Sequence, residues 1–373
     1  MPIVTALRNP DLQASHWADI REMIGQANFD VNEEGFTLQS LIDMNVVQYM
    51  EQIVAKSVEA TGQAKLRAQF NALVDLWKTI QFVTKNYKEQ DSKWILAEIE
   101  DLYTQLDEGI ASINMILGNR FVKVMRTECE NFKKQVTTLN EALDLWSELQ
   151  RTWMYLENIF SGGSIKQQMP EEAKIFENVN KQFLALTLKV QRSPAALRFI
   201  KSNPQVVENL TKMIEMLERV QDRLNIYIDT KKQAFPRFYF LSIEDLIQIL
   251  SNSEDKAIIS LHLKSLFDGM VAVEFKDDNV TKMKSKEREE VELNKPVKTA
   301  RTEVEVWLRT LTEQMKETVR KTLIIGQKEY TEEGRKDWVL KHPGQVVAAV
   351  AQIQWCFQSE EAINDMSMDP LSL

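Results

Sequence analysis

Three features of the sequence predict a mainly α-helical fold. We expect an elongated rod of stacked antiparallel helix pairs or bundles. The 373 residues include only 11 glycines and 9 prolines, about 3% and 2%, against averages of roughly 7% and 5%. Two long stretches repeat apolar residues every three or four positions, as helices that pack side by side do. One region near residues 271–294 alternates instead, which predicts a single small β-hairpin.

Charge, hydropathy and cysteine content exclude several classes of protein. The net charge of −9 is spread along the chain, without a basic block that would favour a nucleic acid partner. Apolar runs such as 346–353 are far shorter than the 18 or so residues that span a bilayer, and Arg8 and Asp11 interrupt any signal peptide. Two cysteines, Cys129 and Cys356, cannot form a disulfide framework. We therefore expect a cytoplasmic protein that binds neither nucleic acid nor membrane.

The first 35 residues are expected to form an irregular N-terminal lead-in. Asn9-Pro10-Asp11 is a turn signal, and a short amphipathic stretch runs from His16-Trp17 to about Ile24. Thr37 then precedes a helical pattern and is a candidate N-cap. We assign the first helical bundle to residues 36–165. Further helices in this bundle are expected over residues 63–87 and 93–117.

The clearest helical signal lies between Leu139 and Phe160. Apolar residues there are separated alternately by three and four positions, the heptad pattern of a coiled coil, and two tryptophans fall on the buried stripe. The stripe consists of Leu139, Ala142, Trp146, Leu149, Trp153, Leu156 and Phe160. Gly162-Gly163 ends this helix, because glycine tolerates the left-handed conformation at a C-terminus. Pro170 suits the start of the next helix.

A second heptad seam marks the second bundle, assigned to residues 166–269. Its apolar residues are Val206, Leu210, Met213, Leu217, Val220, Leu224 and Tyr227. A helix from Gln205 to Lys232 would be about 40 Å long at 1.5 Å per residue. Lys231 and Lys232 fall in its last turn, where cations interact favourably with the helix dipole.

An aromatic segment, residues 235–241, follows this helix. It contains Phe235, Pro236, Arg237, Phe238, Tyr239 and Phe240. One interpretation is a buried elbow whose rings join two helix pairs. The other is that the rod also bends or docks on a neighbour here, with Arg237 as the polar anchor. Together with Gly162 and Gly163, these residues form the candidate hinge or docking site.

The C-terminal third changes its pattern twice. Ser242 is a predicted N-cap for a helix that starts with two acidic residues. Alternation over residues 271–275 and 291–293 predicts two strands within a small β-hairpin at 270–297, with the mixed charges of 282–289 as a solvated loop. Helical spacing resumes in a C-terminal bundle over residues 298–363. Residues 364–373 are expected to fray.

No residue pattern for catalysis or ligand binding is present in the sequence. There is no Gly-Lys dipeptide and hence no phosphate-binding loop. His16, His262 and His342 lack partners at metal-ligand spacing, and no Gly-x-Ser-x-Gly elbow occurs. We therefore predict no catalytic, cofactor-binding or metal-binding residues, and no enzyme activity in this segment.

Several motifs, in the same order, resemble the linker region of dynein heavy chains, their N-terminal region 2. The most characteristic is Lys231-Lys232-x-x-Phe235-Pro236-Arg237-Phe238-Tyr239-Phe240-Leu241-Ser242. The others are Gln150-Arg151-x-Trp153-Met154-Tyr155-Leu156-Glu157, Met169-Pro170-x-Glu172, Met283-x-Ser285-x-Glu287 and Val304-Glu305-x-Trp307-Leu308. The Trp-Met-Tyr-Leu-Glu sequence before a Gly-Gly turn is more similar to axonemal than to cytoplasmic heavy chains. Two residues depart from the family pattern: Ser164 replaces an Asp, and Arg288 replaces a Gly of a tight turn.

The resemblance implies a lever. In the family this region arches over a ring of AAA+ modules, bends and straightens as the first module cycles through ATP, and carries that motion to the tail. The implied partners are the AAA+ ring of the same heavy chain and, indirectly, the dynein complex and microtubules. The implied location is the cytoskeleton, in the axoneme of a cilium or flagellum. Two other functions stay open on the residues alone: a free-standing helical scaffold or adaptor, and an enzyme whose site assembles only in the fold.

Overall fold

The computed structural model describes residues 2–27, 29–31, 36–89, 93–161, 163–332 and 334–364. The predicted mainly α fold with a small β element is confirmed, since helices dominate these ranges and the strands form two small antiparallel sheets. The chain divides into two compact units, Met1–Trp153 with Glu177–Leu217 and Met154–Phe176 with Glu218–Leu373. The boundaries assigned from sequence and the rod-like stacking stay predictions.

The N-terminal residues are not an irregular lead-in, and that prediction was wrong. They form helices α1 (Pro2–Leu7) and α2 (Ala14–Ile24), which pack on α4 (Met50–Thr79). Asn9 Nδ2 donates to the Ser57 carbonyl at 2.9 Å and to Thr61 Oγ1 at 2.8 Å, so the predicted turn is fixed to α4. The apolar residues of α1 find their partners about 50 positions away, and a local pattern does not show this.

The first bundle also contains a two-stranded sheet that was not predicted. Thr37 caps α3 (Leu38–Asp43) as predicted, and η1 (Val46–Tyr49) leads into α4. The helix predicted over 63–87 starts earlier and ends at Thr79. Strands β1 (Val83–Asn86) and β2 (Trp94–Ala97) follow, so the next helix, α5 (Ile99–Leu117), starts later than predicted.

A glutamine side chain completes the hydrogen bonding of strand β2. The Gln150 side-chain oxygen accepts from the Leu96 backbone N–H at 2.8 Å, and its Nε2 donates to the Leu96 carbonyl at 3.0 Å. Gln150 is buried in the long helix α6 (Arg126–Phe160), which η2 (Val122–Met125) precedes. A buried backbone needs such partners. Here the partner is 54 residues away, so the strand has no signal in its own sequence.

Both predicted heptad seams are helical and buried. The first runs along α6, and each of its seven apolar residues is at most 2% exposed. The second runs along α10 (Val206–Ala234), where six of its seven residues are buried and Tyr227 is half-buried. Between them lie α7 (Gly163–Gln168), α8 (Pro170–Arg192), which begins at Pro170 as predicted, and α9 (Ala196–Ser202).

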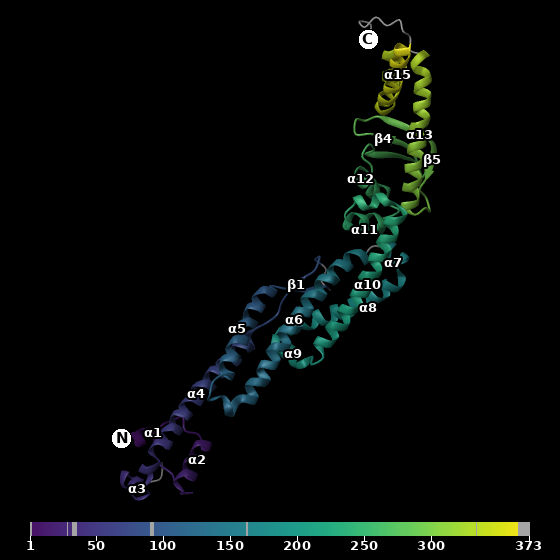
Figure 1. Ribbon diagram of the computed structural model, residues 1–373. Coiled ribbons are helices and arrows are strands. Elements are labelled where there is room, and N and C mark those ends of the chain that lie inside the picture. The colour runs from purple at the N-terminus through teal and green to yellow at the C-terminus, as the bar shows by residue number, and fades with distance from the viewer. Residues whose placement is uncertain are drawn as a thin grey trace. The chain divides into compact units, whose positions relative to one another are not determined.

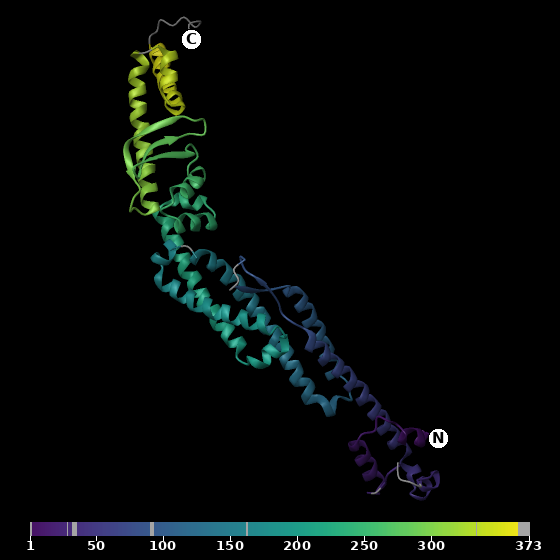
Figure 2. The same cartoon turned by 180° about the vertical axis from the view of Figure 1, so that it is seen from behind.

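The second unit combines short helices, a sheet and a long helix. Its remaining elements are η3 (Pro236–Phe240), α11 (Ile243–Ser251), α12 (Lys256–Leu266), β3 (Ala272–Lys276), β4 (Asn279–Lys284), β5 (Glu290–Lys298), α13 (Val304–Glu332), α14 (Arg335–Lys341) and α15 (Gly344–Asn364). Helix α13 lies beside β5 and α15, as both views show (Figures 1 and 2), and α14 also packs on it.

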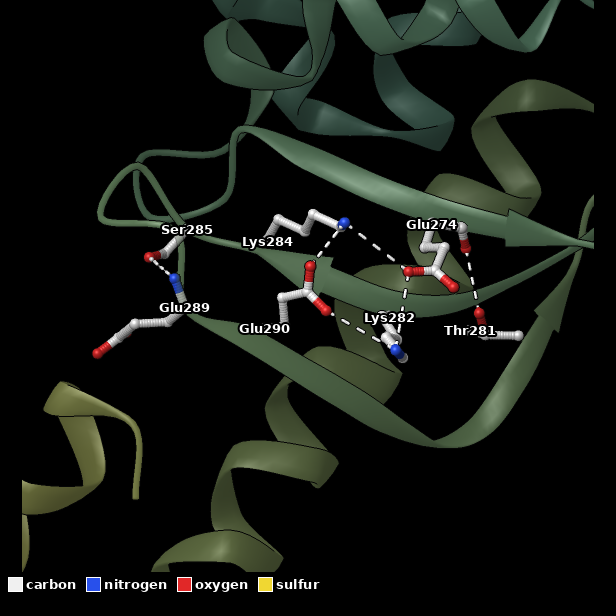
Figure 3. A network of polar contacts seen from close by, with 7 residues as sticks. All are labelled: Glu274, Thr281, Lys282, Lys284, Ser285, Glu289 and Glu290. Carbon is white, nitrogen blue, oxygen red and sulfur yellow. Dashed lines mark hydrogen bonds and ion pairs between the residues drawn. The ribbon is translucent and has the colours of Figure 1, made fainter. Parts of the chain in front are cut away.

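The β element predicted near residues 271–294 has one strand more than a hairpin. The order is β3-β4-β5, and residues 282–284, predicted to lie in a loop, belong to the middle strand. Lys282 and Lys284 lie between Glu274 of β3 and Glu290 of β5 (Figure 3), and Lys284 Nζ is 2.7 Å from Glu290 Oε1. Such opposite-charge pairs across strands stabilise a sheet. The strand was missed because its outward face is charged rather than apolar.

The turn between β4 and β5 forms despite an arginine at the family's glycine position. Arg288 has a φ of 69°, in the left-handed region. Ser285 N donates to the Glu289 carbonyl at 3.0 Å, and Arg288 N donates to the Ser285 carbonyl at 3.2 Å. The tight turn is therefore kept, at a local cost of roughly 1–2 kcal/mol for a side chain in that conformation.

The described ranges contain no helix that is long and apolar enough to cross a membrane. Helix α15 ends at Asn364. The fraying predicted for 364–373 otherwise concerns residues 365–373, which lie outside the described residues.

Replacing Arg288 with glycine should stabilise the chain. The strain at φ 69° is removed, and after the entropic cost of glycine the free energy of unfolding should rise by about 0.5–1 kcal/mol. Urea unfolding of the purified chain measures this. Lys286→Gly is the matched control, because Lys286 is in the same turn without a positive φ, and it should lower the stability. A loss of stability in Arg288→Gly would contradict the strain argument.

Candidate functional site

The aromatic segment forms a hydrogen-bonded connection from α10 to α11. Pro236 has no N–H to continue the helix, and the residue before a proline avoids helical geometry; Phe235 is extended, with φ −136° and ψ 92°. Phe238 N donates to the Phe235 carbonyl at 3.0 Å, which closes the turn of η3. Ser242 then caps α11 as predicted, accepting from Asp245 N at 3.1 Å. The connection is thus a defined turn without glycine.

Two of the four rings are buried. Phe235 and Phe238 meet edge to face, with ring centroids 5.0 Å apart and an angle of 84°, and Phe238 is 0% exposed. Phe235 also lies 6.5 Å from the ring of Phe267, at the end of α12. Aromatic pairs in this geometry add to the free energy gained by burial. These two rings agree with the interpretation of the segment as a buried elbow.

Arg237, the positively charged residue of the segment, makes its contacts within the same unit. Arg237 Nη1 donates to the Leu266 carbonyl at 2.8 Å, and its guanidinium carbon is 4.8 Å from the centroid of the Phe267 ring. Leu266 is the last residue of α12, where helix carbonyls lack partners in their own helix. Arg237 therefore caps α12, so the polar group expected to anchor a neighbour already holds an internal contact.

The other two rings face solvent. Tyr239 is 59% exposed and Phe240 is 70% exposed. Lys232 Nζ lies 5.4 Å from the centroid of the Tyr239 ring, and Ile243 extends the apolar surface into α11 at 44% exposure. Adjacent exposed aromatic side chains are a feature of interaction surfaces. The part of the segment available for docking is therefore Tyr239 and Phe240.

The second candidate break is only partly described. Gly162 lies outside the described residues, and Gly163 is the first residue of α7. Helical hydrogen bonding continues to the end of α6, where Ser161 N donates to the Glu157 carbonyl at 2.9 Å. Helix α7 packs on α11. The elements that follow the two candidate breaks are therefore neighbours, which their separation in sequence did not indicate.

Residues of two separate motifs form a polar junction that was not predicted from the sequence. Lys231 Nζ is 2.7 Å from Glu303 Oε2 and 2.5 Å from Glu305 Oε1, across more than 70 residues. Burial, which would lower the pKa of Lys231, is outweighed by the hydrogen bonds to the two carboxylates, so the pKa of Lys231 is raised. Sequence position alone had assigned Lys231 to the helix dipole. Acidic residues at a helix start are too common to have revealed the pairing.

A tyrosine and a glutamine complete this junction. Lys231 Nζ lies 5.3 Å from the centroid of the Tyr227 ring, and the Tyr227 hydroxyl donates to Gln168 Oε1. Burial raises the pKa of Tyr227 to about 12, so the hydroxyl keeps its proton near neutral pH. Gln168 is the last residue of α7. The polar junction therefore joins α7, α10 and α13.

His16 and His342 make structural contacts. His16 Nδ1 accepts from Gln13 N at 3.1 Å at the start of α2, and the His342 ring is 2.9 Å from Glu329 Oε2. In the described part of the chain, no group of three His, Cys, Asp or Glu side chains is placed to hold a metal ion.

Comparison with known proteins identifies the family. The sequence matches the family described as "Dynein heavy chain, N-terminal region 2" over residues 1–325. The chain belongs to the dynein heavy chain family. It is 32% identical to human dynein axonemal heavy chain 6, 31% identical to human dynein axonemal heavy chain 12, and 30% identical to the Chlamydomonas reinhardtii dynein-1-beta heavy chain of the flagellar inner arm I1 complex. The resemblance found in the sequence motifs is confirmed.

This dynein heavy chain sequence corresponds to a small part of its relatives. The three alignments cover 97%, 95% and 98% of the chain, but only 9%, 11% and 8% of the three relatives. The activity, substrates and partners of a whole heavy chain therefore belong to a protein about ten times as long.

Phe238 and Phe240 should differ sharply in their contribution to stability. Phe238→Ala removes a fully buried ring and should lower the free energy of unfolding by about 3–5 kcal/mol. Phe240→Ala removes an exposed ring and should change it by less than about 0.5 kcal/mol. Chemical denaturation of the two variants makes the comparison, with the same substitution two positions apart as an internal control. Equal losses would show that Phe240 is buried in solution.

Proposed function

We propose that this segment of a dynein heavy chain is a linker. It acts as a lever that transmits the ATP-driven motion of the AAA+ ring of the same heavy chain to the tail in microtubule-based motility. The observation that carries the proposal is the pair of long helices with continuous buried seams, α6 of 35 residues and α10 of 29 residues. At 1.5 Å per residue they are about 52 Å and 43 Å long.

Interlocked side chains support the transmission of force within the first unit. A Cβ atom at Gly109 of α5 would lie 2.6 Å from the Trp77 ring of α4, and one at Gly62 of α4 would lie 2.4 Å from the Phe121 ring. Each ring therefore fills the space that a side chain would occupy. Close packing of this kind transmits strain, because packed interiors are hardly compressible. Sliding of α4 along α5 would require the Trp77 ring to leave its place.

The segment supplies mechanics rather than chemistry in this proposal. No phosphate-binding loop occurs in the sequence, so we expect ATP to bind elsewhere in the heavy chain. The family membership also favours a lever over a free-standing scaffold. The relatives are named as axonemal and flagellar dyneins, which supports a location in the axoneme of a cilium or flagellum, with microtubules as indirect partners.

We assign the docking role to Tyr239 and Phe240. Their exposed rings sit beside a capped turn that holds them at the end of α10, and rigid aromatic side chains are common centres of protein interfaces. The AAA+ ring of the same heavy chain is the proposed partner of this surface. The buried rings Phe235 and Phe238 support the turn from within.

Weakening one seam residue tests the lever. In an intact motor that carries this sequence, Leu224→Ala leaves a cavity under α10 that loosens its packing. We expect the ATPase rate to be kept and microtubule gliding velocity to fall about twofold, because a loosely packed α10 transmits less of the motion. Asp222→Ala, on the exposed side of the same helix, is the control and should leave velocity unchanged. If the Leu224→Ala motor moves microtubules at the wild-type velocity, the lever proposal is wrong.

Removing the exposed rings tests the docking surface separately. Tyr239→Ala combined with Phe240→Ala should reduce gliding velocity severalfold without changing the melting temperature, since both rings are exposed. Leu261→Ala on α12, which is 66% exposed, is the matched control for the loss of exposed apolar surface. Unchanged velocity and unchanged ATPase coupling in the double variant would show that these rings contact nothing of functional consequence.

A further inference from the structure

The polar junction of Lys231, Glu303, Glu305, Tyr227 and Gln168 is more than a surface ion pair. The Lys231 side chain is 13% exposed and that of Glu305 is 8% exposed. Glu305 Oε2 is buried and has no hydrogen-bond partner within the described ranges, so Lys231 is the cation that compensates this carboxylate. Removing one member of a buried pair leaves an uncompensated charge. The junction is therefore sensitive to Lys231 in a way that exposed pairs are not.

The junction connects two helices that are far apart along the chain. Between Lys231 at the end of α10 and Glu303 at the start of α13 lie η3, α11, α12 and the sheet, a separation of 72 residues. The ion pairs connect α10 to α13 directly. A load on α13 can therefore reach α10 by two routes, one through the junction and one through the intervening elements.

The direct route is the better anchored of the two. Tyr227 lies against the Lys231 ammonium, and its hydroxyl is held by Gln168 of α7, so the lysine is restrained from a second helix. The first turn of α13 is fixed by Val304 and Leu308, both buried. The intervening route is attached to α13 through β5, where Asn294 N donates to Thr318 Oγ1, but it consists of helices of at most 11 residues and strands of at most 9. Short elements can open locally at a lower free energy than long helices.

We propose that Lys231 is the positioning residue that passes load directly from α13 to α10 and so reduces the load on the elements of residues 232–302. This inference rests on the proposed lever function for its purpose, but the load path is a property of the chain itself. Glu305 is the buried partner that fixes the lysine, and Glu303 is a second, exposed partner.

Single-molecule pulling on the 373-residue chain tests the load path. Handles are attached through cysteines at Glu218 on α10 and Lys316 on α13, both exposed, after the exposed Cys356 is replaced by serine. In Lys231→Met the first rupture force should fall by roughly a third or more, because opening under force follows the unfolding rate. Rupture should then release up to about 240–260 Å of chain from residues 232–302, at 3.3–3.6 Å per residue.

Three controls separate the load path from general destabilisation. Lys232→Met alters the neighbouring lysine, which contacts Tyr239, and should leave the rupture force at the wild-type value. Lys231→Arg keeps the charge and should restore most of the force. Pulling Lys231→Met between Lys316 and an exposed Glu360 on α15 does not load the junction, and the force there should equal that of the wild type. Equal forces along the first axis in Lys231→Met and wild type, or an equal loss along both axes, would overturn the proposal.

The motor assay then distinguishes this inference from the proposed function. If the pulling result holds and Lys231→Met in an intact motor lowers gliding velocity at unchanged ATPase rate, both are supported. If pulling shows the direct load path but Leu224→Ala leaves motor velocity unchanged, the junction exists and the lever function fails. If Leu224→Ala lowers gliding velocity at unchanged ATPase rate while Lys231→Met keeps the wild-type rupture force, the lever function is supported and the role of Lys231 is rejected.

Discussion

The continuous apolar stripe along α6 is the constraint on which the rest of the structure depends. Trp153 shows why the stripe admits one arrangement: its indole N–H donates to Asn180 Oδ1 at 2.9 Å, and its ring is 4.7 Å from the ring of Phe183 and 5.2 Å from that of Tyr87. A shift of α6 that brought a smaller residue of the stripe to this position would lose the hydrogen bond and both ring contacts. Helix α8 and the sheet of β1 and β2 are thereby set in register with α6. One turn earlier on α6, the buried side-chain amide of Gln150 holds strand β2 by a hydrogen bond to the Leu96 backbone.

The aromatic segment divides its rings between the interior and the solvent. The extended conformation of Phe235 and the 3₁₀ turn that follows it decide together which rings are buried. Phe235 and Phe238 share the buried face, while Tyr239 and Phe240 fall outside it. The sequence identified the cluster and its position between two helices, but not which rings are buried, because the type of turn decides that. Arg237 shows the same limit: its partner is a carbonyl at the end of α12, 29 residues away.

Features set by neighbouring residues could be predicted, and features set by distant partners could not. Heptad spacing located α6 and α10, and the short polar side chains of Thr37 and Ser242 marked helix starts, because caps and seams are local. Helix α1 and strand β2 depend on α4 and Gln150, far along the chain, and their own residues carry a weak signal. The middle strand β4 was hidden by its charged outward face. The junction at Lys231 needed the fold itself, since two motifs 72 residues apart meet there.

The pairing of Gln150 with strand β2 has a consequence for crowded surroundings. A sheet edge with free N–H and C=O groups can recruit a strand from another molecule, which is how ordered aggregates grow. At Leu96 both groups are already occupied by the side-chain amide. In the other sheet, Asn294 N of β5 donates to Thr318 Oγ1 at 3.1 Å, and Pro296 in the same strand has no N–H to offer. Strands β2 and β5 thus each have backbone groups that are not available to a strand from another molecule, which lowers the tendency of these two edges to recruit one.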